Sequence, residues 1–372
     1  MLPFRRLTAA LAGALAAATF VSVQGASAQT EVSGRGASLR LGGRVHVQYA
    51  ASSAEGDRAH FFLRRARIEG DITVNDFLDA RIQPEFGAGG AGLRDAFVRL
   101  RFSPGFQVTM GQFKRPFDPF WMASSVDLSL IERDGRVGGV NECAGVGSVC
   151  SFSRLTGQLA YADRDLGVRI AGTRGRFSWE GAVTNGTGQN VPDENGAKSY
   201  SGRVTARAGS SFTLGGNVAL HDYVDPGRGD AYASAWGVDA QVGSWRDGLL
   251  LQGAIVGGDN WRRLRTAGGG APVDPARPGA GPWEPASFLA FQAVASYYAP
   301  LEGGRFSGIE PLLRVSLADP DQDGHDDGGA VLTPGLMLYV AGRSKIGFNW
   351  DVWLPSGGNA EHSLKVQTFL YF

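Results

Sequence analysis

The chain has 372 residues and no formal net charge, with 36 Lys and Arg against 36 Asp and Glu. Its 43% hydrophobic content excludes wholesale disorder, and its neutrality argues against a nucleic-acid-binding protein. The 55 glycines, about 15% of the chain and twice the usual fraction, favour tight turns and closely approaching strands over helices.

Residues 1–28 have the pattern of a secretory signal. Two arginines precede an apolar run over 7–23, and Ala26-Ser27-Ala28 fits a small-residue cleavage site. An uncleaved membrane anchor is the alternative, but the run is short for a span. We therefore predict that the mature protein is an exported chain of residues 29–372, in which no later stretch has the length of an apolar transmembrane helix.

Hydrophobicity alternates with a period of two along most of the mature chain, which is typical of strands with one apolar face. Over 60–73, for example, Phe62 and Ala66 fall on one face, whereas Arg65 and Arg67 fall on the other. Residues 153–161 alternate only weakly and are not counted. The pattern predicts sixteen strands, at 39–49, 60–73, 77–86, 93–102, 106–113, 166–173, 176–184, 200–208, 211–221, 231–245, 248–258, 286–298, 307–318, 329–341, 344–354 and 362–372.

The connections between these strands alternate in length. Short turns of two or three residues, several with glycine, follow the second, fourth, sixth, eighth, tenth and fourteenth strands. The intervening connections are long and rich in Gly, Asp and Pro, and the longest spans 114–165. Alternating strands, short turns at one end and long loops at the other predict an all-β fold, a closed antiparallel transmembrane barrel. A secreted all-β adhesin or carbohydrate-binding protein is the alternative, although it does not explain the alternation of connection lengths.

Several motifs occur in the same order as in one known family. They are Leu41-Gly42-Gly43-Arg44, Phe61 to Gly70, Leu93 to Val98, Gly111 to Phe117, Ser124-Ser125 with Ile131-Glu132-Arg133, Arg164 to Val168, Thr184 to Gly188 and Ile346 to Trp350. This ordered set resembles the phosphate-selective porin O/P family of Gram-negative outer membranes. The resemblance extends over nearly all of the mature chain and is strongest over 41–135.

The resemblance implies a homotrimer of sixteen-stranded barrels in the outer membrane, inserted by the barrel assembly machinery and surrounded by lipid. Its third outer loop, here within 114–165, is expected to fold into the lumen and narrow it. The function implied is passive diffusion of small hydrophilic solutes with a mild preference for anions such as phosphate or polyphosphate. Where the family carries a lysine shortly before Ser124-Ser125, this chain has Trp121, while Lys114 and Arg67 replace uncharged positions.

Arginine and lysine are the side chains that an anion pathway needs, since they replace lost hydration with charged donors. Arg44, Arg64 and Arg65 match arginines of the family's constriction, and Arg67 and Lys114 complete the candidate set. Strict alternation places Arg64 on the apolar face, so it needs a bulge to reach the lumen. Arg65 and Arg67 could instead pair with Glu69, Asp71 or Asp95 and stiffen the wall. Further lumen candidates are Arg81, Asp95, Arg99 and Arg101.

A census of the charged strand face gives twelve basic and nine acidic residues, which predicts a lumen of mixed sign with a mild anion preference. The two cysteines, Cys143 and Cys150, lie in the 114–165 loop, and an exported setting favours a disulfide between them. Asp319, Asp321 and Asp323 before Gly324 resemble half of a calcium loop, but Ala330 stands where the bidentate glutamate belongs. An acidic, solvated loop over 319–327 is the simpler interpretation.

The five histidines are scattered, and the sequence has no nucleophile elbow, phosphate loop or zinc-ligand spacing. We therefore expect a protein that is not an enzyme and that needs no cofactor, apart from weak calcium binding at the acidic loop.

Overall fold

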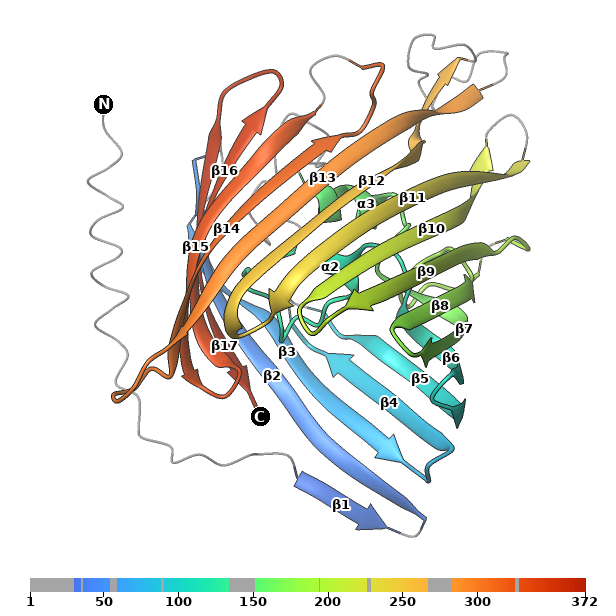
Figure 1. Ribbon diagram of the computed structural model, residues 1–372. Coiled ribbons are helices and arrows are strands. Elements are labelled where there is room, and N and C mark those ends of the chain that lie inside the picture. Colours follow the sequence, from blue (N-terminus) through green and yellow to red (C-terminus); the bar gives the residue numbers. More distant parts are fainter. Residues whose placement is uncertain are drawn as a thin grey trace.

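A computed structural model describes residues 30–372 apart from 35, 54–58, 88–89, 134–150, 194, 226–228, 267–282 and 325–327. Sixteen strands, β2 to β17, pair antiparallel with their sequence neighbours. The ring closes where β17 pairs with β2, with Phe369 opposite His46, and it is continuous where β9 pairs with β10. The predicted closed sixteen-stranded barrel is therefore confirmed (Figure 1).

The elements run in this order: β1 Thr30–Gly34, β2 Ala37–Ser52, β3 His60–Thr73, β4 Leu78–Glu85, β5 Gly92–Ser103, β6 Phe106–Lys114, α2 Pro119–Met122, α3 Phe152–Gln158, β7 Arg164–Arg174, β8 Phe177–Thr184, β9 Ser199–Ala208, β10 Phe212–Asp225, β11 Gly229–Ser244, β12 Asp247–Thr266, β13 Trp283–Pro300, β14 Gly308–Asp319, β15 Gly329–Ala341, β16 Ser344–Pro355 and β17 Glu361–Tyr371. Each predicted strand corresponds to one of β2 to β17.

Two elements differ from the prediction. Strand β1 lies just after the predicted cleavage site and pairs with the first residues of β2, with Thr30 opposite Leu41. It extends the wall below the ring, on the side of the C-terminus (Figure 1). The weakly alternating segment 153–161 contains helix α3, which begins after Ser151, whose hydroxyl accepts a hydrogen bond from the Arg154 amide at 3.3 Å.

The two ends of the barrel differ as the connection lengths predicted. Short turns at one end join β5 to β6, β7 to β8, β9 to β10, β11 to β12 and β15 to β16. Gly209 and Gly342 have φ angles of 66° and 54° in two of these turns, a conformation that glycine adopts without strain. The long connections lie at the opposite end, and helices α2 and α3 of the longest one sit inside the ring of strands (Figure 1).

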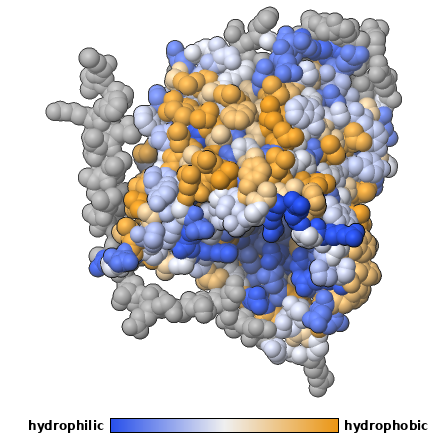
Figure 2. Space-filling view, in the orientation of Figure 1, coloured by the Kyte–Doolittle hydropathy of each residue, from blue (hydrophilic) through white to orange (hydrophobic). Residues whose placement is uncertain are grey.

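The outer face of the strands is apolar. Outward residues such as Val98, Val218 and Leu249 are exposed, whereas their strand neighbours point into the barrel. Figure 2 shows these side chains as a hydrophobic zone over the strands that face the viewer, with hydrophilic side chains at the upper rim and in the hollow beneath. In the described part of the chain, no helix is long and apolar enough to cross a membrane.

Candidate functional site

The connection between β6 and β7, residues 115–163, is called loop three here, and it begins with a tight turn. Asp118 has a φ of 60° and caps α2, because its carboxylate accepts hydrogen bonds from the amides of Phe120 at 2.9 Å and Trp121 at 3.2 Å. The other carboxylate oxygen accepts a 2.6 Å bond from the Thr156 hydroxyl in α3. Burial raises the pKa of Asp118 to about 6. One buried carboxyl therefore joins the two short helices.

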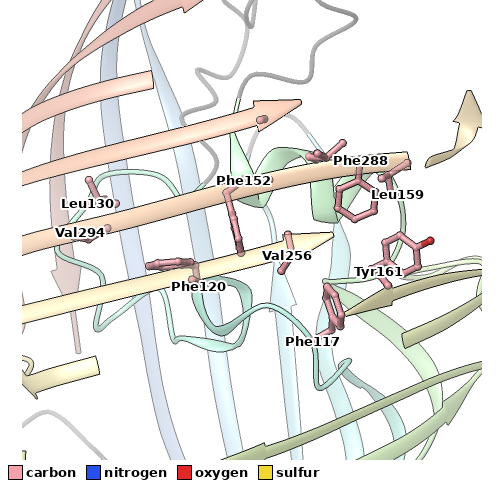
Figure 3. Close-up of a cluster of buried hydrophobic side chains, with 14 of the residues drawn as sticks. Phe117, Phe120, Leu130, Phe152, Leu159, Tyr161, Val256, Phe288 and Val294 are labelled. Atoms are coloured by element: carbon pink, nitrogen blue, oxygen red, sulfur yellow. The ribbon is translucent and has the colours of Figure 1, made fainter. Parts of the chain in front are cut away.

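Loop three packs its apolar side chains against one part of the inner wall. Phe117, Phe152 and Tyr161 are fully or almost fully buried and belong to one cluster with Val256 of β12 and Phe288 of β13 (Figure 3). The same wall contributes small residues from β10 to β14, which leave room for the loop. They are Ala219, Ala233, Ala235, Ala254, Ala290 and Ala318. Burial of the larger rings supplies the main attraction between loop and wall.

Hydrogen bonds at both ends of this contact fix the loop. The Tyr161 hydroxyl donates to the carbonyl of Asp259 at 2.7 Å, and the Trp261 indole donates to the carbonyl of Leu159 at 2.8 Å. The Ile131 amide donates to Asn349 Oδ1 at 2.8 Å. Because the loop occupies the side of the lumen next to β10–β16, the open space lies toward β2–β8.

Glu132 ties the free side of loop three to the opposite wall. Its carboxylate, 4% exposed, accepts from Arg64 at 2.6 and 3.1 Å and from Arg65 at 3.1 and 3.0 Å. Burial by itself would raise the pKa of Glu132, but these two guanidinium groups hold it well below its ordinary value. Arg314 of β14 also donates to the carbonyls of Glu132 and Arg133, at 3.2 and 3.0 Å.

Both arginines reach Glu132 because β3 contains a bulge. His46 of β2 is opposite Arg65 and Val47 is opposite Leu63, so Arg64 is the extra residue of the bulge. The extra residue turns Arg64 inward, as the sequence required for a lumen position. It also reverses the faces before it, so Phe62 lies on the inner side and packs against buried Ala50, whereas Phe61 is exposed. The predicted apolar-face position of Phe62 was therefore wrong.

A cavity of about 650 Å³ separates loop three from strands β2 to β7. All five candidate residues, Arg44, Arg64, Arg65, Arg67 and Lys114, line it, as do Arg81, Asp95 and Arg99. Arg101 lines a neighbouring cavity of about 530 Å³ near the short turns, together with Gln107 and Arg169.

The large cavity is predominantly basic. Its twelve basic residues are Arg44, Arg64, Arg65, Arg67, Arg81, Arg94, Arg99, Lys114, Arg133, Arg164, Arg169 and Arg343. Its five acidic residues are Glu69, Asp95, Asp127, Glu132 and Asp163. Four more carboxylates, those of Asp71, Asp79, Glu85 and Glu180, pair with these cations from beyond the lining. Twelve cations against nine anions leave a moderate excess of positive charge.

The ion pairs of the central arginines differ from those expected. Arg65 pairs with Glu132 of loop three, and Arg67 pairs with Glu85 of β4 at 3.0 Å, so neither pairs with Glu69, Asp71 or Asp95. The strand pattern shows which residues share a face, but it does not show the register between neighbouring strands, which decides the residues that lie side by side. Arg44 instead forms an ion pair with Glu69, and Arg164 of β7 forms one with Asp95 at 2.6 Å.

Lys114 contributes to the shape of the cavity as well as to its charge. Its ammonium donates to the carbonyls of Met122 and Ala123 at 3.2 and 2.7 Å, at the end of α2. Arg133 donates to the carbonyls of Phe120 and Ala123 at 2.8 and 2.6 Å, and burial lowers its pKa to about 9. Both cations hold the helix that borders the open space.

Sequence reasoning missed Glu132, Arg133 and Phe97 as lining residues. Glu132 and Arg133 stand in a recognised motif, but the contact of Glu132 with β3 spans more than sixty residues and has no local signal, and Arg133 bonds to backbone carbonyls of α2 and Ala123 that no side-chain pattern marks. Phe97 could have been found, because alternation places it with Asp95 and Arg99 on the inner face of β5.

Other candidates lie elsewhere. Cys143 and Cys150 fall outside the described residues, as does the 1–28 segment, so the disulfide and the signal peptide stay predictions. Asp321 is buried, and its carboxylate accepts from Arg265 Nε at 2.8 Å. Its other oxygen accepts from the amide of Asp323 at 3.3 Å, and Asp319 in turn accepts from the amide of Asp321 at 3.1 Å. These contacts support a folded acidic turn, and calcium binding there stays a prediction.

Comparisons with known proteins agree with this architecture. The family model for phosphate-selective porin O and P matches residues 38–263, more than half of the chain. No match was found among curated protein sequences.

Solved structures share the fold at low identity. The anion-selective porin from Comamonas acidovorans is 15% identical, with a TM-score of 0.61 over 90% of this chain and 100% of that chain. OmpF from Salmonella typhi, in complex with daunomycin, is 13% identical, with a TM-score of 0.60 over 92% of this chain and 100% of that one. The trimer form of OmpT from Vibrio cholerae, described as an outer membrane protein, is 11% identical, with a TM-score of 0.55 over 90% and 99%.

Proposed function

Because this chain belongs to the phosphate-selective porin O and P family, we propose that it is a passive, mildly anion-selective channel whose solutes include phosphate. The barrel places it in the outer membrane of a Gram-negative bacterium, with the apolar outer strand faces in lipid. The observation that carries the selectivity is the cavity between loop three and β2–β7, in which twelve cations outnumber the nine carboxylates that line it or pair with them.

The route of a solute follows from this geometry. Loop three fills one side of the lumen, so an anion must pass beside Arg44, Arg67 and Arg99 on the opposite wall. Guanidinium groups suit this task because each is planar, always charged and able to donate two parallel bonds to an oxyanion. The nearby carboxylates keep the potential moderate, so an anion that enters can also leave.

Arg64, Arg65 and Lys114 have a second role in this proposal. Arg64 and Arg65 are engaged by Glu132, and Lys114 by two backbone carbonyls. We assign them to the shape of the constriction and to its long-range potential. We assign direct contact with the permeating ion mainly to Arg44, Arg67 and Arg99, whose carboxylate partners belong to the strand wall and not to loop three.

We also propose that three such barrels form a homotrimer, for which the trimer form of the similar OmpT structure provides support. The signal pattern of residues 1–28 supports export, followed by insertion through the barrel assembly machinery. A secreted adhesin is not favoured. A soluble all-β protein would cover its apolar strand faces with a second sheet, whereas this closed ring leaves its apolar faces on the outside.

The proposal assigns no catalysis to the chain. Ser199, His221 and Asp222 come close together, with Ser199 Oγ at 3.1 Å from His221 Nδ1. Asp222, however, binds the serine hydroxyl and not the imidazole, so it does not orient the histidine as a catalytic triad requires.

The test is the reversal potential of purified protein in planar lipid bilayers under a potassium chloride gradient. The proposal expects chloride to permeate several-fold better than potassium, and phosphate at low millimolar concentration to reduce the chloride current. A reversal potential of the opposite sign would reject anion preference, and a chloride current insensitive to phosphate would reject phosphate as a solute.

A further inference from the structure

Two partly exposed aromatic rings stand among the cations of the large cavity. Phe97 points inward from β5, between Asp95 and Arg99, and Trp121 lines the same space from α2. Phe113 of β6 also contributes to the lining, although only 1% of it is exposed. A wall that served only hydrated inorganic anions would gain nothing from these rings, because the face of an aromatic ring carries negative charge density.

Each ring has a guanidinium group beside it. The Arg99 guanidinium lies 5.8 Å from the ring centre of Phe97, and the Arg133 guanidinium lies 5.8 Å from that of Trp121. Arg169 lies 5.1 Å from the ring centre of Phe113. These pairs present a flat apolar surface and a positive charge next to each other.

The Trp121 ring is held in place. Its indole nitrogen donates to the carbonyl of Ser153 at 2.6 Å, and its six-membered ring packs against Gly157, where an added Cβ would come within 2.9 Å. A ring fixed in this way loses little freedom when a solute stacks on it.

The cavity also holds donors without partners. In the described part of the chain, the Nε atoms of Arg44, Arg67 and Arg169 are buried and have no hydrogen-bond partner. Arg44 and Arg67 lie opposite each other on β2 and β3, with 3% and 7% of their surface exposed. Unpaired buried donors favour an acceptor that arrives from the lumen.

From these observations we infer that the cavity prefers small organic anions whose carboxylate or phosphate is attached to an aromatic ring. The acidic group takes hydrogen bonds from the arginines, while the ring of the solute stacks in an offset manner on Phe97 or Trp121. This inference rests on the proposed function, since it names the class of anion that the same constriction favours.

The experiment compares two probes that differ only in the aromatic group. Phenyl phosphate and methyl phosphate are titrated against the chloride current of the full-length protein in planar bilayers, at a pH where both are dianions. We expect phenyl phosphate to halve the current at a concentration at least fivefold lower than methyl phosphate does. Equal half-blocking concentrations for the two esters would overturn the inference.

Variants locate the preference. Phe97→Leu and Trp121→Leu keep an apolar side chain but remove the ring, and each should reduce the preference for phenyl phosphate at least twofold. Phe102→Leu is the matched control on the same strand, because Phe102 is 56% exposed on the outer face and should leave the ratio unchanged. A preference that survives in the Phe97→Leu, Trp121→Leu double variant would also overturn the inference.

The two proposals fail in different ways. Inorganic phosphate block and the reversal potential of the unaltered protein test the anion channel, whereas the ratio of the two esters tests the aromatic preference. An anion-selective, phosphate-blocked channel with equal ester potencies would keep the first proposal and reject the second.

Discussion

The Glu132 carboxylate should control how firmly loop three is held across the lumen. It is almost fully buried, and four hydrogen bonds of 2.6 to 3.1 Å join it to Arg64 and Arg65. Replacement by glutamine keeps the size of the side chain but leaves two partly or fully buried guanidinium groups without a counter-charge. Removing one partner of a buried ion pair costs about 3–5 kcal/mol.

That cost sets the expected size of the effect. Because one decade in an equilibrium constant corresponds to about 1.4 kcal/mol, the equilibrium constant for loop opening in Glu132→Gln should rise by about two to three and a half decades. The amide of Ile131 reports on opening directly, since it donates to Asn349 only when the loop is in place. Hydrogen exchange measured by mass spectrometry, on protein in lipid nanodiscs, should show faster exchange around residues 130–133 by a factor of at least about 100.

Asp71→Asn provides the matched control. Asp71 lies on β3, the strand of Arg64 and Arg65, and pairs with Arg81 at 2.6 Å, but the side chains of Asp71 and Arg81 are 40% and 37% exposed. An exposed pair of this kind contributes about 0–1 kcal/mol, so exchange around residue 131 should change less than about threefold. Equal exchange in the two variants would refute the idea that Glu132 holds the loop.

Three further changes probe other parts of the molecule. Burial raises the pKa of Asp118 to about 6, so the closed loop keeps a proton that an open loop releases. The free energy of loop opening should therefore fall by up to about 3 kcal/mol as the pH rises from about 4 to 7. Hydrogen exchange of the Phe120 and Trp121 amides, corrected for intrinsic rates, measures this change. Asp118→Asn should remove this pH dependence, and an unchanged profile in that variant would contradict the assignment. Arg44→Gln should lower the chloride-to-potassium permeability ratio, measured from reversal potentials, by roughly half. Arg174→Gln, at an exposed short turn, should leave this ratio unchanged. Equal effects of the two variants would show that Arg44 is not at the constriction. Arg265→Ala removes the main partner of the buried Asp321 carboxylate and should lower the free energy of unfolding, measured by urea titration, by about 3 kcal/mol. Arg262→Ala, at an exposed residue, should lower it by less than about 0.5 kcal/mol. Similar values for both variants would argue that the Arg265–Asp321 pair does not hold this turn.

Strand positions were predictable because a barrel wall imposes a strict rule on every residue. Outward positions such as Val98 must be apolar and inward ones such as Arg99 polar, so a period of two is visible along nearly the whole chain. The rule fails where loop three packs on the inner wall, as at Val256 and Phe288, and where the backbone departs from regular pairing. At Arg64 a single extra residue reverses the two faces of β3. Alternation could indicate that a lumen position for Arg64 conflicts with its place on the apolar face, but it could not show that Phe62 would turn inward.

The interior of loop three was not predictable in the same way. Its position depends on contacts such as Phe152 with β13 and Glu132 with β3, which join residues far apart in the chain. Short helices like α2 have too few residues to produce a periodic pattern, although Asp118-Pro119 is an ordinary helix start. The clustering of Arg44, Arg65 and Arg67 was foreseeable from their shared face, whereas the inward turn of Arg64 and the acidic partners were not.

The alanines on the inner wall of β10–β14 have a consequence for the evolution of pore width. Loop three rests on Ala233, Ala254 and Ala290, on a surface that a permeating ion never contacts. An increase in side-chain volume at these positions would push the whole loop toward the arginines and narrow the passage without altering a single charge in it. Pore width is therefore set by side chains on β10–β14, and selectivity by side chains on β2–β7. Mutations can change one property and leave the other intact.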